Sequence, residues 1–236
     1  MKLYDAIIQN TLEQLSAQKP AVYVYSEEKC WQDNGKSELV MLRDAAFELG
    51  GSGKASVNYT CVTGSEGTIT QDEVWLYGKP LEKLTGDVSF ARITLLEVED
   101  LGEDEDAYQA IRKMEFVRYH VFPAGYMVRV SSQSNQEQVR VSRQAVKSGI
   151  SFESVGCAYI RKYRQLKGVR HVRVIFVTDS GVVETLRANA KKVDDITKTL
   201  THILDGLPTD CGHCEMKPVC DEVEGMRELH LGKRKT

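Results

Sequence analysis

The chain has 236 residues, of which 42% are hydrophobic and 28% are charged, and its formal net charge is −3. This composition is that of a soluble globular protein, long enough to bury a core in one large domain or two small ones. The slight negative charge excludes a bulk field that attracts nucleic acid or an anionic membrane. The sequence shows no apolar run near the ~18 residues of a membrane span and no signal-peptide core at its start. We therefore expect a cytoplasmic protein.

The predicted elements alternate between helix and strand without a regular rhythm. An amphipathic helix is expected over residues 3–18, where apolar residues recur at helical spacing. Strands are predicted over residues 21–25, 57–62, 74–77, 88–98, 125–131, 138–141 and 171–178. Further helices are predicted over residues 37–49, 107–120, 152–166, 181–204 and 221–231, with a short one after Ser142.

This order of elements predicts an α+β fold. The strands come in runs with hairpin-length turns, which favours a mostly antiparallel sheet with packed helices, followed by a C-terminal cysteine loop and a short helix. A soft boundary near residues 100–105 divides the chain into an N-terminal α+β subdomain, residues 1–102, and a second subdomain, residues 103–236.

The most informative motif lies near the C-terminal end, where Cys211, Cys214 and Cys220 fall within ten residues. A two-residue spacer lets two thiolates from one turn reach the same metal, and the following loop returns a third. This is how cysteine ligands for zinc or for an iron–sulfur cluster are usually supplied. The other three cysteines lie apart in apolar or mixed surroundings and are expected to be small buried hydrophobic residues, namely Cys30, Cys61 and Cys157.

The cysteine spacing alone leaves the metal open. Three cysteines without a clear fourth suit an iron–sulfur cluster with one open or non-cysteine site, whereas structural zinc needs four protein ligands. The candidate fourth ligands are His213, which lies between two cysteines, and His230, which would have to fold back. The glycine-rich segment 50–54 lacks the spacing of a phosphate loop, and we interpret it as a helix stop and turn.

The chain from about residue 88 to Cys220 resembles the cluster-bearing region of acetyl-CoA synthase, the β subunit of the carbon monoxide dehydrogenase/acetyl-CoA synthase complex. The resemblance rests on the order of five blocks that lead to the cysteine loop. They are ITLLEV (93–98), YMVRV (126–130), VSRQAVKSGI (141–150), VGCAYIRKY (155–163) and VRVIFVTD (172–179).

This resemblance implies that Cys211, Cys214 and Cys220 are ligands of a [4Fe–4S] cluster. In that family a further cysteine bridges the cluster to nickel, where methyl, CO and coenzyme A are joined by acyl transfer. This sequence has a shorter gap between Cys214 and Cys220, no later cysteine and no Cys-Gly-Cys nickel motif. The resemblance therefore implies a role in CO/acetyl-CoA metabolism, with a protein partner from such a system and no complete nickel site. The alternative is a non-catalytic binding or scaffold module with structural zinc.

Overall fold

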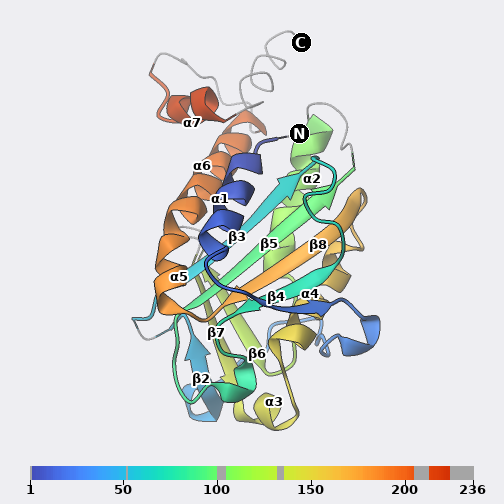
Figure 1. The fold of residues 1–236 in the computed structure, drawn as a ribbon, viewed down its shortest axis with the longest axis vertical. Coiled ribbons are helices and arrows are strands. Elements are labelled where there is room, and N and C mark those ends of the chain that lie inside the picture. Colours follow the sequence, from blue (N-terminus) through green and yellow to red (C-terminus); the bar gives the residue numbers. More distant parts are fainter. Residues whose placement is uncertain (1, 52, 100–104, 132–135, 205–212, 224–236) are drawn as a thin grey trace.

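The computed structural model of the chain describes residues 2–51, 53–99, 105–131, 136–204 and 213–223 (Figure 1). Within these ranges the fold is α+β, as predicted, and contains a five-stranded sheet and a three-stranded sheet. None of the helices in these ranges is long and apolar enough to cross a bilayer.

The five-stranded sheet is mixed and has the order β1-β4-β8-β5-β3. Its strands are β1 (Ala21–Val24), β3 (Ser56–Thr63), β4 (Glu73–Tyr77), β5 (Phe90–Val98) and β8 (Val169–Val177). β3–β5 and β4–β8 pair in parallel, and β1–β4 and β5–β8 pair antiparallel. Every residue of β5 is buried, as expected for a strand that is covered on both faces. The late strand β8 lies between two early strands, so residues on both sides of the predicted subdomain boundary form one sheet.

The three-stranded sheet is antiparallel and lies at the lower end of the molecule in Figure 1. It has the order β2-β7-β6, formed by β2 (Ala45–Leu49), β6 (Tyr126–Ser131) and β7 (Gln136–Ser142). With this sheet included, most strand pairings are antiparallel.

The helices cover both faces of the larger sheet. They are α1 (Asp5–Leu15), α2 (Glu105–Phe116), α3 (Arg143–Lys147), α4 (Phe152–Tyr163), α5 (Ser180–Thr185), α6 (Arg187–Leu204) and α7 (Lys217–Glu222). The short 3-10 helices are η1 (Glu27–Lys29), η2 (Leu42–Asp44), η3 (Leu81–Lys83) and η4 (Val117–Tyr119).

Adjacent residues of β3 show which helices cover which face, because side chains alternate along a strand. The Tyr59 hydroxyl lies 2.8 Å from Thr11 Oγ1 of α1. Its neighbour Thr60 points the other way, with Oγ1 3.5 Å from the Tyr163 hydroxyl of α4. In Figure 1, α1 and α6 accordingly lie in front of β3 and α4 lies behind the sheet. α4 packs closely on β4 at Gly156, which has no side chain. A Cβ at this position would lie only 2.5 Å from Val74 Cγ2 of β4.

Two expectations about helices were wrong. Residues 37–49 do not form an α-helix, and their last part is β2, where burial alternates along the strand with the period of a half-buried sheet. Gly50 and Gly51 therefore follow a strand rather than ending a helix. The long helix predicted over residues 181–204 is interrupted at Leu186, between α5 and α6. A short helix that was not predicted, α7, contains Cys220. Most of the helix predicted over residues 221–231 lies outside the described residues, from residue 224.

A buried ion pair joins the two sheets. Arg92 Nη2 of β5 lies 2.5 Å from Glu137 Oε2 of β7, and the two side chains are 1% and 0% exposed. Asn58 Nδ2 of β3 also donates to Glu137 Oε2, and the Arg92 guanidinium carbon lies 4.0 Å from the centre of the Tyr159 ring of α4. Burial alone lowers the pKa of Arg92, but the charge of Glu137 raises it overall, so the arginine stays ionised.

Replacing Arg92 with methionine is expected to destabilise the protein strongly, because it leaves the Glu137 carboxylate buried without its counter-ion. The free energy of unfolding, measured by urea denaturation, should fall by about 3–5 kcal/mol. The double variant Arg92→Met/Glu137→Gln should recover part of this loss, since the buried charge is gone while an oxygen remains for Asn58.

The matched control is Arg170→Met, because Arg170 pairs with Glu66 in solvent, at side-chain exposures of 38% and 77%. It should change the free energy of unfolding by less than about 1 kcal/mol. Equal losses in Arg92→Met and Arg170→Met would contradict the role given to the buried pair.

Candidate functional site

Two of the three predicted metal ligands lie on one short segment at the upper end of the molecule in Figure 1. Cys214 precedes a turn that leads into α7, and Cys220 lies within α7. The Lys217 amide donates to the Cys214 carbonyl at 3.1 Å, and the Cys220 amide donates to the Met216 carbonyl at 3.2 Å. These bonds fix the backbone at both cysteines, and both side chains are partly exposed.

Of the other predicted ligands, the structure describes only His213. Cys211 and His230 lie outside the described residues, and His213 is exposed in the turn before Cys214. In the part of the chain that the structure describes, no group of three His, Cys, Asp or Glu side chains is arranged to hold a metal ion. The thiols of Cys214 and Cys220 have the donor chemistry for zinc or iron.

The remaining cysteines have environments that keep the thiol protonated. Cys61 and Cys157 are fully buried in the core, and burial raises the pKa of each thiol. Cys30 is partly buried, and desolvation raises the pKa of its thiol to about 11 although Arg161 acts in the opposite direction. Metal binding needs a thiolate, so these environments disfavour Cys30, Cys61 and Cys157 as ligands.

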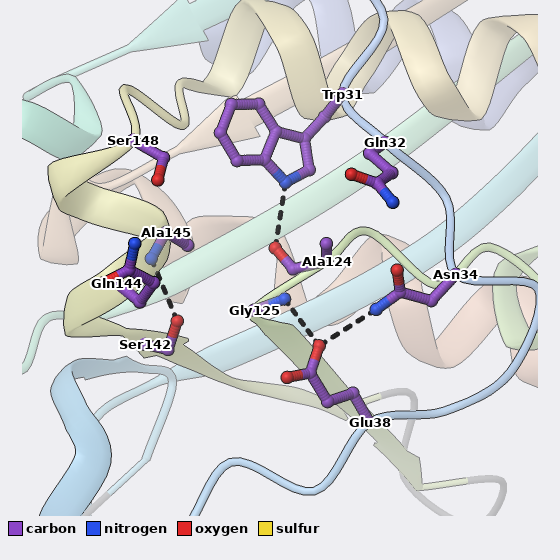
Figure 2. A pocket seen from close by; sticks show the side chains of 10 residues that line it. All are labelled: Trp31, Gln32, Asn34, Glu38, Ala124, Gly125, Ser142, Gln144, Ala145 and Ser148. Atoms are coloured by element: carbon purple, nitrogen blue, oxygen red, sulfur yellow. Dashed lines mark hydrogen bonds between the residues drawn. The ribbon is translucent and has the colours of Figure 1, made fainter.

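A surface hollow of about 490 Å³ at the opposite end of the molecule was missed by the sequence analysis (Figure 2). Three chain segments supply its walls: the loop before η2, the two residues before β6, and the segment from the end of β7 through α3. The lining residues are Trp31, Gln32, Asn34, Glu38, Ala124, Gly125, Ser142, Gln144, Ala145 and Ser148.

Hydrogen bonds hold the walls of this hollow in place. Trp31 Nε1 donates to the Ala124 carbonyl at 2.8 Å, and the Ala124 amide donates to the Gln32 carbonyl at 2.9 Å. Glu38 Oε2 accepts from the Gly125 amide at 2.8 Å and from Asn34 Nδ2 at 3.0 Å (Figure 2). Gly125 has φ +70°, and a Cβ added at this position would lie 2.5 Å from Ser142 Oγ. A larger residue would therefore disrupt the wall of the hollow at this point.

The sequence holds one weak signal for this hollow. Trp31 is followed by the polar residues Gln32, Asp33 and Asn34. Its large apolar side chain is not part of the apolar periodicity of a helix or a strand. Nothing in the sequence indicates that residues 124–125 and 142–148 meet it. Two basic side chains at the end of α4 have carboxylate partners, since Arg161 pairs with Glu27 at 3.3 Å and Arg164, just after the helix, pairs with Asp72 at 2.5 Å.

Comparison with known proteins adds no relative: no family model matches this chain, and no curated protein matches it.

Alkylation should separate the two groups of cysteines in the metal-free protein. Iodoacetamide at pH 8 should modify Cys214 and Cys220 rapidly, because they are accessible, while Cys61 and Cys157 should react only after unfolding. Peptide mass spectrometry over a time course measures this, with the denatured protein as the control for complete labelling. Fast modification of Cys61 in the native protein would contradict the assigned burial.

Proposed function

We propose that this chain binds an iron–sulfur cluster through Cys211, Cys214 and Cys220, and that it is related to the cluster-bearing region of acetyl-CoA synthase. The observation that carries the proposal is the Cys-x-x-Cys-x₅-Cys spacing, with its second and third cysteines partly exposed on one hydrogen-bonded turn and helix. A preformed backbone at two ligands lowers the ordering entropy that metal binding must overcome.

The packing of α7 supports a site at the end of the molecule rather than in its core. Val219, Cys220 and Val223 pack against the edge of the hydrophobic core, whereas Cys214 lies in the preceding turn. The side of the segment that carries Cys220 is thus anchored, and Cys214 lies in the partly exposed turn beside it. A [4Fe–4S] cluster held there would supply electron transfer or an open iron position.

The reaction of the family is not part of the proposal. Nickel-centred acyl transfer uses a further cysteine and a Cys-Gly-Cys segment, and this sequence has neither. A role within CO/acetyl-CoA metabolism, together with a partner protein from that system, follows from the resemblance of the blocks between residue 93 and the cysteine loop.

Anaerobic purification followed by iron, zinc and acid-labile sulfide analysis tests the proposal. The intact chain should contain iron and sulfide, absorb as a brown cluster protein and give a paramagnetic signal on reduction. Cys214→Ser and Cys220→Ser should each lose most of the iron, because a cluster depends on each thiolate ligand.

Cys30→Ser is the matched control, since Cys30 is also partly buried but lies far along the chain from the cysteine loop. It should retain the full iron content. A colourless protein with stoichiometric zinc and no sulfide would refute the cluster and support the structural-zinc module. Metal retention in Cys214→Ser and Cys220→Ser would refute both.

A further inference from the structure

The hollow beside Trp31 is independent of the cysteine segment and has its own chemistry. Its walls come from three segments that are joined by backbone hydrogen bonds, including Ser142 N to the Gly125 carbonyl at 2.8 Å. Its volume, about 490 Å³, falls within the range of small-molecule sites, roughly 300–1,000 Å³. A preformed hollow of this kind binds without first ordering its walls.

The charge of the hollow selects against anions. Among the described residues that line it, Glu38 alone is charged. Both donors to this carboxylate, Asn34 and Gly125, reach Oε2, and Figure 2 shows Oε1 directed away from them toward Ser142. Oε1 is therefore placed to accept hydrogen bonds from a ligand, and its charge disfavours phosphates and carboxylates.

The uncharged lining groups both donate and accept hydrogen bonds. Gln32 and Gln144 carry an amide carbonyl and an NH₂ group, and Ser148 carries a hydroxyl, all on exposed side chains. Alcohol groups likewise donate and accept, so several hydroxyls on one ligand match this lining.

The Trp31 ring supplies an apolar surface in a fixed orientation. Its N–H is already bonded to the Ala124 carbonyl, and Figure 2 shows the ring face-on at the edge of the hollow. The C–H face of a sugar ring packs on such a surface while its hydroxyls reach the polar walls. We propose that this hollow binds a neutral polyhydroxyl compound of about monosaccharide size, with Trp31 under the ring and Glu38 and Gln144 bonded to its hydroxyls.

A neighbouring hollow of about 440 Å³ provides the competing possibility. It shares Glu38, Ser142 and Gln144 with the first and is also lined by Arg143 and Lys147. A ligand that used these basic side chains would be anionic. Phosphorylated and unphosphorylated forms of one sugar therefore distinguish the two.

Isothermal titration calorimetry of the intact chain tests the proposal with neutral hexoses and pentoses, and with glucose 6-phosphate beside glucose. At least one neutral sugar should bind saturably, and its phosphorylated form should bind about tenfold more weakly because of Glu38. Gln144→Ala should weaken binding of the neutral sugar. Glu38→Gln should reduce the difference in affinity between the neutral sugar and its phosphorylated form.

The control variant is Glu28→Gln, an exposed glutamate of η1 outside the hollow, which should change neither affinity. The proposal is overturned if no neutral sugar binds, if the phosphorylated form binds as tightly or more tightly, or if both hollow variants behave like the control. None of these results bears on the iron content of the cysteine segment, so the two proposals fail separately.

Discussion

The contact between Arg92 and Glu137 determines how the two sheets are placed against each other. The pair is 1% and 0% exposed, and sliding β5 against β7 would leave both charges buried without their partner, so the two strands have little freedom to shift. Ser56 strengthens this constraint, because its hydroxyl oxygen accepts from the Glu137 amide at 2.8 Å and its proton goes to the Glu137 carbonyl. Polar contacts therefore fix the position of the three-stranded sheet relative to β3 and β5. Such contacts are more directional than apolar packing.

The position of β8 extends this constraint to the whole chain. β8 pairs antiparallel with β5 and parallel with β4, and both partners come from the first hundred residues. The core of the larger sheet therefore forms only once residues as late as 169–177 can pair with β4 and β5. Non-local pairing of this kind is typical of slower folding than local hairpins give. It also places α4, which precedes β8, over strands from the start of the chain.

The sequence predicted those helices and strands that are determined by their own apolar pattern. The prediction failed where contacts with distant parts of the chain determine the secondary structure. The apolar spacing of α1 and the β-branched run of β8 each indicate one structure, and both were found. Residues 45–49 contain good helix formers, but pairing with β7 overrides their propensity. Glu137 adjoins a polar turn and would be expected in solvent, since nothing local indicates that Arg92 meets it. The hollow beside Trp31 was missed for the same reason, whereas the cysteine spacing is visible within ten residues.

The separation of α7 and α3 along the long axis in Figure 1 has a practical consequence. Air oxidation attacks exposed thiols, and Cys214 and Cys220 lie at one end of the molecule, while the lining of the distant hollow contains no sulfur among its described residues. Oxidation of the cysteine segment on the bench therefore leaves the lining of the hollow chemically unchanged. The sugar titrations proposed above can thus be run in ordinary buffers, and only the metal analysis requires a glove box.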